Sequence, residues 1–556
     1  MRKFSITGTV LTIVLLTGCV QLPRDGQIQL GPDLQNELTT DYLYYSPSGP
    51  VDGDSAEQII EGFLNAGTGP QNDYAVAREF LTTKFRTKWD PNQRVLIQDG
   101  KPQVTLTVDD SASVTVTASA QVDEQGKYES LTNGTRETFN YLLEKEGGQW
   151  RIAEAPNVTM IIRPVFDAVF REYSIYFFDN QQKYLIPDVR WFPARASTST
   201  RLVAAMLKGP SDWLVGAVRS PIPEGTKLSL STVSVSDGVA NVDLSAKALN
   251  ASRSALQLAI VQLKETLMQL DGVFSVQVSI ERTPIETIPT TTGLVTPLTY
   301  SPVVLSEGSI SHVGISNSTT VTSATDLIGK YGATDFALSP DEKRFVMVTP
   351  TGVYSANLNN VNQNLSLLTV AQGWLSPIID RQGFIWLIPK SGKKQIEVFD
   401  ANGNKIDFNS GRLTQQNRIG FSISNEGGRA AIITGKTGNT QVRYASIMRN
   451  QEGIPRNIDS PVTLDASPNA VAIAWIDETQ IGFIENQGDG YTIPLVAKIG
   501  GSIRQLPSVQ NAVQISGSGL ESSIFVLDKF GALMQYRGTN WTVVRGNVDA
   551  IHFPGN

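Results

Sequence analysis

The sequence predicts a multidomain protein in which two α+β domains precede an all-β domain built from a repeated unit. Its 556 residues are too many for one hydrophobic core, and about 150 residues per domain gives three or four domains. The 47 glycines and 28 prolines indicate many turns and hence much β structure. A module of short strands recurs through roughly the last 260 residues at the spacing of propeller blades, roughly 40 to 50 residues.

The N-terminal segment has the order of a secretory signal peptide. Arg2 and Lys3 precede an uncharged apolar run over residues 4–16, and the small residues Thr17 and Gly18 follow it. The run is too short for a stable transmembrane helix, which needs about 20 apolar residues. We therefore expect residues 1–18 to be a signal peptide.

Cys19 comes directly after this segment and is the only cysteine of the chain. The run Leu16-Thr17-Gly18-Cys19 resembles the bacterial lipobox, in which a diacylglycerol is attached to the cysteine sulfur and the new amine is often acylated, as with palmitate. The alternative is an ordinary signal peptide beside an incidental cysteine. The resemblance implies a lipid anchor on Cys19, since two or three acyl chains hold a protein durably on a membrane. It also implies a place on the extracytoplasmic face of the cell membrane.

The bulk composition excludes several classes of function. A formal net charge of −7 disfavours nucleic acid as a partner, because phosphate binding requires a basic surface. A Ser-His-Asp site, a His-rich zinc site or a haem would have to use His312 or His552, since the chain has only two histidines. We therefore expect no enzyme activity, no metal and no cofactor.

Residues 19–50 carry several prolines and glycines without helical periodicity and predict an extended linker after the lipidated N-terminus. The first α+β domain is expected over residues 51–165. Asp54 and Glu57 have the spacing of a capping box at the start of one helix, and apolar residues at helical spacing predict a second helix over residues 73–89. Alternating strands follow, and the closing Gly148-Gln149-Trp150-Arg151-Ile152 resembles the last strand of NTF2-like or cystatin-like domains. Some members of that class form a concave pocket, and others are simple scaffolds.

The second α+β domain is expected over residues 168–285. Its pattern predicts a helix over residues 197–208 that ends at Gly209, a strand over residues 228–235, a hairpin turn at Asp237-Gly238 and a long helix over residues 252–270. The order of these pieces resembles the GerMN domain of spore-germination and actinobacterial lipoproteins. That family has no catalytic residues to transfer. Asp179 and Asp243 could act as an acid/base pair, or as carboxylates that terminate turns and strands.

Residues 286–299 predict a linker, and residues 300–556 an all-β propeller of about six blades. Five modules begin near Phe336, Leu375, Gly420, Ile473 and Val513. A last inner strand at residues 550–554 has no outer strands of its own, and residues 303–314 could supply them from the other end of the domain. Such a closure joins the chain ends and removes exposed strand edges. It would also place His312 and His552 in one blade, where packing is the expected role.

Taken together, the lipobox, the NTF2-like domain, the GerMN-like domain and the propeller resemble the actinobacterial LpqB lipoprotein family. The resemblance covers the chain from Cys19 onward. It implies an accessory component of the MtrA–MtrB two-component system, which binds the extracellular part of the sensor kinase MtrB and modulates the control of cell-wall homeostasis and division. The partner-binding residues are not identified by it.

Two other functions remain open from the residues alone. One is a sensor that binds a cell-wall glycan or peptide at a propeller mouth, for which an aromatic cluster is required. The candidates for that cluster are Trp374, Trp386, Trp475 and Trp541, which could equally be core residues. The other is a glycan hydrolase with two carboxylates about 5 to 9 Å apart.

Overall fold

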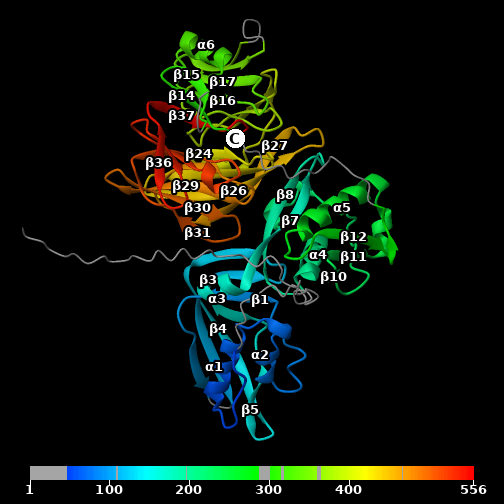
Figure 1. Ribbon diagram of the computed structural model, residues 1–556. Helices are drawn as coiled ribbons and strands as arrows, with labels where there is room; N and C mark the ends of the chain where they lie inside the picture. The colour runs from blue at the N-terminus through cyan, green and yellow to red at the C-terminus, as the bar shows by residue number, and fades with distance from the viewer. Residues whose placement is uncertain are drawn as a thin grey trace, which may run out of the picture. The chain divides into compact units, whose positions relative to one another are not determined.

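The computed structural model describes residues 47–107, 110–195, 197–286, 301–314, 319–359, 365–465 and 467–555 (Figure 1). All of them belong to one structural unit. Leu16, Thr17, Gly18 and Cys19 lie outside the described residues. No helix in the described ranges is both long and apolar enough to cross a membrane.

The first domain contains a sheet with strand order β5-β4-β3-β1-β6. Strand β1 pairs with the C-terminal half of β3, and β2 pairs with its N-terminal half. Strand β3 alternates buried and half-buried residues along its length. One face of the sheet is therefore covered by the helices, and the other face remains accessible to solvent. The strands are β1 (Arg94–Gln98), β2 (Gln103–Thr107), β3 (Ser111–Asp123), β4 (Tyr128–Glu146), β5 (Gln149–Glu154) and β6 (Thr159–Ile162). The helices are α1 (Ala56–Ala66) and α2 (Ala75–Glu79), with the 3₁₀ helix η1 (Gln71–Asp73) between them.

The N-cap of α1 is one residue later than predicted. Ser55 and Gln58 form the capping box, and Asp54 instead accepts a hydrogen bond from the backbone N–H of Val51 at 2.8 Å. Glu57 contributes an acidic charge to the first turn, where the helix dipole favours it. The sequence pattern therefore located the helix start to within one residue.

The predicted second helix over residues 73–89 is wrong in its length. Helix α2 ends at Glu79 because the next residues pair with strand β5. The N–H of Thr82 donates to the carbonyl of Ile152 at 3.0 Å, and the N–H of Ile152 donates to the carbonyl of Phe80 at 2.9 Å. These tertiary hydrogen bonds override the helical spacing of the apolar residues.

The second domain begins with α3 (Arg163–Val169), which runs directly into β7. It contains two sheets, with strand orders β8-β7-β9 and β10-β11-β12-β13. The strands are β7 (Phe170–Asp179), β8 (Leu185–Pro193), β9 (Val218–Arg219), β10 (Ser234–Ser236), β11 (Val239–Leu244), β12 (Ser275–Ile280) and β13 (Thr283–Pro284). The helices are α4 (Thr198–Lys208) and α5 (Arg253–Leu267), with the 3₁₀ helices η2 (Asp212–Leu214) and η3 (Ala246–Asn250).

Several predicted elements of this domain are found close to their expected places. Strands β10 and β11 pair around the Asp237-Gly238 turn, where both residues have positive φ, as a type I′ turn requires.

The strand predicted over residues 228–235 is largely absent. The backbone N–H of Val233 donates to the hydroxyl of Thr200 in α4 at 2.9 Å, and the hydroxyl of Ser199 donates to the carbonyl of Val233 at 3.0 Å. Helix α4 therefore takes the backbone groups that a longer strand would have used.

The predicted propeller is confirmed, with six blades among the described residues. The inner strands are β16 (Asp335–Leu338), β20 (Ile378–Ile379), β24 (Arg418–Ile423), β28 (Ala470–Trp475), β33 (Ala512–Ser516) and β37 (Val548–His552). The outer strands are β17 (Arg344–Thr349), β18 (Gly352–Asn357), β19 (Ser366–Thr369), β21 (Ile385–Leu387), β22 (Glu397–Phe399), β23 (Lys405–Ile406), β25 (Arg429–Lys436), β26 (Asn439–Arg449), β27 (Pro455–Asp465), β29 (Gln480–Gly488), β30 (Tyr491–Lys498), β31 (Ile503–Gln505), β32 (Val509–Gln510), β34 (Phe525–Asp528), β35 (Leu533–Tyr536) and β36 (Trp541–Arg545). Helix α6 (Thr322–Tyr331) and the 3₁₀ helices η4 (Gly411–Gln415) and η5 (Glu521–Ser523) lie in the connections.

The ring closes as the sequence indicated. Strand β37 from the C-terminal end pairs with β14 (Val303–Ser306), which pairs in turn with β15 (Ser309–His312). Figure 1 shows the red β37 beside the green β14 and β15. Ring closure pairs the first and last strands of the domain, so β14 has a partner on each side.

Candidate functional site at the junction of the three domains

Strand β8 is the element around which the three domains meet. It is an edge strand, paired only with β7 among the described strands, and Pro187 and Pro193 fit that position because proline cannot donate to a ladder. Nevertheless, every residue of β8 is buried. The first domain and the propeller cover the edge strand from outside its own domain.

Trp191 of β8 touches both neighbouring domains. Its backbone N–H donates to the carbonyl of Gly126 in the first domain at 2.7 Å, and its indole N–H donates to the carbonyl of Gly500 in the propeller at 2.6 Å. Its ring lies 5.0 Å from that of Phe166 in α3, within an apolar cluster that includes Val95 and Ile97 of β1. The backbone and side chain of one residue thus connect three domains.

A buried ion pair lies beside Trp191 on the same strand. Arg190 and Asp188 are 2.6 Å apart (Nη2 to Oδ2), with side-chain exposures of 0% and 2%. The carboxylate also accepts the N–H and the hydroxyl of Ser211, each at 2.7 Å. Arg190 donates to the carbonyls of Gln125 at 3.0 Å and Gly209 at 3.3 Å. The pair therefore connects β8 to the first domain and to the loop of its own domain that follows α4.

The second domain and the propeller share a continuous apolar core. The rings of Trp213 and Tyr444 meet edge to face at 4.8 Å, a preferred aromatic geometry. Tyr176 donates its hydroxyl to Glu478 of the propeller at 3.1 Å. Burial raises the pKa of Glu478, against the opposing hydrogen bond from Tyr176. Glu172 and Lys498 form a further ion pair across this interface.

A cleft of about 660 Å³ opens where these contacts meet, and its walls come from all three domains. A volume of this size at a domain junction is typical of a site for a small ligand. The ion pair between Lys127 and Asp212 (3.2 Å) joins the first and second domains in its wall. Polar, aromatic and aliphatic residues line it: Gln93, Arg94, Gln121, Asp123, Lys127, Tyr128, Glu129, Asn157, Val158, Asp188, Val189, Ser211, Asp212, Trp213, Tyr444, Val462, Ile499 and Gly500.

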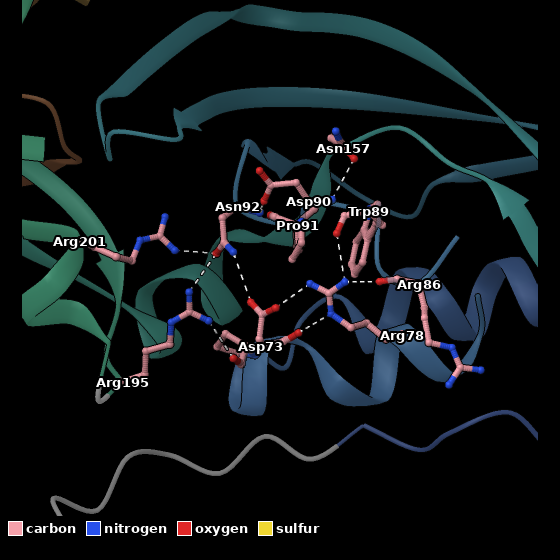
Figure 2. Close-up of polar contacts among 12 residues, drawn as sticks. Asp73, Arg78, Arg86, Trp89, Asp90, Pro91, Asn92, Asn157, Arg195 and Arg201 are labelled. Carbon is pink, nitrogen blue, oxygen red and sulfur yellow. Dashed lines mark hydrogen bonds and ion pairs between the residues drawn. The ribbon is translucent and has the colours of Figure 1, made fainter. Parts of the chain in front are cut away.

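A second polar cluster joins the first and second domains, as Figure 2 shows. Arg195 and Arg201 both donate to the side-chain oxygen of Asn92, at 3.1 and 2.6 Å. Asn92 in turn donates to Asp73 at 3.5 Å, and Asp73 forms an ion pair with Arg78 at 2.6 Å. Burial, with the nearby positive charge of Arg195, lowers the pKa of Arg201 to about 10. A neutral amide thus connects two arginines of one domain to a carboxylate of the other.

The backbone at this cluster is strained. Asn72, Asp73 and Tyr74 all have positive φ, a conformation that side chains other than glycine adopt at a cost. Tyr74 is fully buried, and burial raises its pKa although Arg195 and Arg201 oppose the rise. The tight turn directs Asp73 toward Arg78 and Asn92. It thereby supports the hydrogen bonds that Asn92 accepts from Arg195 and Arg201 of the second domain.

The other residues singled out from the sequence have structural roles. Asp179 accepts the backbone N–H groups of Lys183 and Tyr184 in the β7–β8 turn, and Asp243 accepts from Ser279 and from the N–H of Arg282. Both carboxylates terminate turns and strands, one of the two roles that the sequence allowed.

The two histidines lie on β15 and β37 of the closing blade, as expected. His552 is 2.9 Å from Asp335 on β16, and His312 is 3.2 Å from Glu342. Hydrogen bonds from His552 and Ser376 outweigh the burial of Asp335 and hold its pKa below its usual value. This cluster joins neighbouring blades. No group of three or more metal-ligating side chains occurs within the described ranges.

The four tryptophans do not form one aromatic cluster. Trp386 and Trp475 are buried core residues on different blades, and Trp374 and Trp541 donate to backbone carbonyls of their own surroundings. Sequence reasoning missed the junction residues, although one signal was available. Asp188 and Arg190 are two residues apart in the apolar run of β8, which places two opposite charges on one face of a buried strand.

Three family models match the chain in order. The model described as "Lipoprotein LpqB, N-terminal domain" matches residues 49–167, "Sporulation and spore germination" matches residues 174–286, and "Lipoprotein LpqB beta-propeller domain" matches residues 308–554.

Curated relatives agree with these matches. Lipoprotein LpqB of Cutibacterium acnes is 31% identical over 257 residues, which are 46% of this chain and 43% of that protein. Lipoprotein LpqB of Thermobifida fusca is 29% identical over 49% of this chain and 45% of that protein. The matched region thus spans less than half the length of these relatives. Among solved structures, the first GerMN domain of the sporulation protein GerM from Bacillus subtilis is 21% identical, with a TM-score of 0.19, over 23% of this chain and 94% of that chain.

Proposed function

Because the chain belongs to the LpqB lipoprotein family, we propose that it is a membrane-anchored accessory protein that binds the extracytoplasmic domain of an MtrB-like sensor kinase. By this binding it modulates an MtrA–MtrB-like two-component system in the control of the cell wall and division. The anchor is a lipid on Cys19, and the protein acts on the outer face of the membrane.

The observation that carries the proposal is the joined domain array. Continuous apolar clusters connect the second domain to the propeller and to the first domain. A contact on one domain therefore positions the others, as an adaptor requires. A lipid tether raises the effective concentration of such an adaptor near a membrane receptor, so a modest interface suffices.

An exposed sheet edge in the second domain offers a docking surface for the kinase. Strand β10 pairs with β11 on one side, and all of its residues are exposed. Leu230, Val235 and Phe274 are exposed to 46%, 43% and 71%. Phe274 packs against the Gly238 turn at the end of this edge. An edge strand with open backbone groups and exposed apolar side chains beside it is suited to pairing with an added strand.

The test is the affinity of residues 20–556 for the purified extracytoplasmic domain of the kinase. We expect saturable binding in the micromolar range or tighter, and at least a tenfold loss with Phe274→Ser. The matched control is Phe530→Ser, since Phe530 is 73% exposed on the propeller. Loss of binding only in Phe530→Ser would move the interface to the propeller. No binding at all, together with a thermal shift on cell-wall fragments, would contradict the proposal and favour a glycan sensor.

A further inference from the structure

We propose that a cleft between the β20–β23 and β24–β27 blades of the propeller binds an acidic saccharide, that is, a sugar chain that carries anionic groups. The cleft has a volume of about 570 Å³, which is within the range of ligand sites. Its walls come from the loop after β21, the segment leading into β24 and the β25–β26 hairpin. This inference is independent of kinase binding.

The cleft is a local concentration of positive charge on an acidic protein. The segments that carry the lining residues, 389–395, 415–418 and 434–443, contain six lysines and arginines and no aspartate or glutamate. Two of these six residues, Lys393 and Lys436, line the cleft itself. The whole chain has a formal net charge of −7. None of these six side chains takes part in an ion pair with any residue that the structure describes. The ammonium groups of Lys393 and Lys436, which line the cleft, are therefore available to an anion from outside.

Arg418 organises one wall of the cleft. Its guanidinium donates to the carbonyls of Pro389, Ser391 and Lys394 at 3.0 to 3.1 Å and to that of Leu413 at 2.6 Å. All four partners are neutral, and the side chain is almost fully buried. The loop that carries Lys393 is thus wrapped around a cation that no carboxylate compensates.

The wall is also held by a close backbone approach. A Cβ atom on Gly392 would lie 2.3 to 2.6 Å from backbone atoms of Gln416, so only glycine fits there. The N–H of Gly392 donates to the side-chain oxygen of Asn417 at 3.1 Å. The two segments therefore form one preformed wall.

Arg443 lies directly behind the carboxamides of the cleft. It donates to the side-chain oxygens of Gln416, at 2.9 Å, and of Gln441. Its Nε is buried and has no hydrogen-bond partner among the described residues. Because both amide oxygens are occupied by Arg443, the amide NH₂ groups of these glutamines remain as donors to a ligand.

The donor set identifies the class of ligand. Five carboxamides (Gln415, Gln416, Asn417, Asn439 and Gln441) line the cleft with Lys393 and Lys436. Side-chain amides suit the hydroxyl groups of sugars, and lysine ammonium groups suit carboxylate or phosphate as point charges. A concave, amide-lined surface favours a sugar chain over a flat anionic membrane.

The experiment is calorimetric titration of residues 20–556 with hexameric oligogalacturonate, a neutral cello-oligosaccharide of the same length and hexaglutamate. We expect binding of oligogalacturonate that is at least tenfold tighter than that of the other two and that weakens with salt. The variant K393Q/K436Q should lose at least tenfold in affinity. The control K101Q/K227Q removes the same charge from exposed lysines outside the propeller and should bind like the wild type.

Each other outcome overturns the proposal. Equal affinity for the neutral sugar would remove the role of charge. Tighter binding of hexaglutamate would indicate an acidic peptide. In a parallel sedimentation assay with phosphatidylinositol vesicles, binding to the vesicles without binding to oligogalacturonate would indicate a membrane surface. Unchanged affinity in K393Q/K436Q, with a thermal melt like that of the wild type, would place any site elsewhere.

Discussion

The buried pair of Asp188 and Arg190 allows a sharp test of how the domain junction is stabilised. The substitution Asp188→Asn removes the negative charge and keeps the shape. An asparagine oxygen in the place of Oδ2 can still accept from Ser211 N–H and from Arg190, and its NH₂ can donate to the hydroxyl of Ser211. The hydrogen bonds are therefore preserved, and only the compensation of the Arg190 charge is lost.

The expected cost is large because Arg190 is completely buried. Removal of one partner of a buried ion pair costs about 3 to 5 kcal/mol, since the remaining charge stays desolvated. Every 1.4 kcal/mol is a factor of ten, so amide hydrogen exchange of β7 and β8 should become at least about 100-fold faster. This effect is measured by hydrogen-exchange mass spectrometry of peptides from these two strands, in the protein that comprises residues 20–556.

A double variant separates charge from shape. Asp188→Asn with Arg190→Gln removes both charges and keeps polar groups toward the carbonyls of Gln125 and Gly209. We expect the double variant to recover at least half of the loss in the free energy of opening, because the uncompensated charge is gone. The reasoning is refuted if the double variant exchanges as fast as the single variant, or if the single variant costs less than about 1 kcal/mol.

Three further outcomes follow from the structure. Trp213→Ala removes the ring that packs on Tyr444 and should cost about 3 to 5 kcal/mol, measured by urea unfolding, with faster proteolysis between the second domain and the propeller. Glu478→Gln should stabilise the protein at pH 7.5 more than at pH 4.5, because a raised pKa in the folded state means that the wild type loses stability as the pH rises from 4.5 through that pKa; urea midpoints at both values test this. Asp335→Asn should lower the melting temperature of the propeller, because it removes the charged acceptor of His552. The wild type should lose stability as the pH falls below 3.8 through the depressed pKa of Asp335. Calorimetry measures both effects.

The parts of the fold that the sequence predicted are those set by local chemistry or by repetition. The Asp237-Gly238 turn requires positive φ at both positions, and this dipeptide supplies it at low cost. The propeller repeats its inner-strand pattern, so the incomplete last module at residues 550–554 implied partners from residues 303–314. Ring closure was therefore predictable from counting strands.

The parts that the sequence did not predict depend on contacts between distant segments. Helix α2 is short because Thr82 and Phe80 bond to β5, more than 60 residues away, and no helical pattern records that competition. The junction at Asn92 brings Arg195 and Arg201 to the first domain, and arginines in a single sequence give no sign of their partners. Charged residues inside the apolar strand β8 were the one local signal.

The shared core determines which experiments can locate a binding surface. A propeller cut away from the second domain would expose Tyr444, Ile433 and the other apolar side chains that now pack against Trp213 and its neighbours. Newly exposed apolar surface of this kind binds other proteins without specificity, so binding by an isolated propeller would not identify its natural contact. Single substitutions of exposed residues in the full set of domains avoid this problem. The pair Phe274→Ser and Phe530→Ser therefore gives a cleaner answer than truncation, because each changes one exposed ring and leaves the shared core intact.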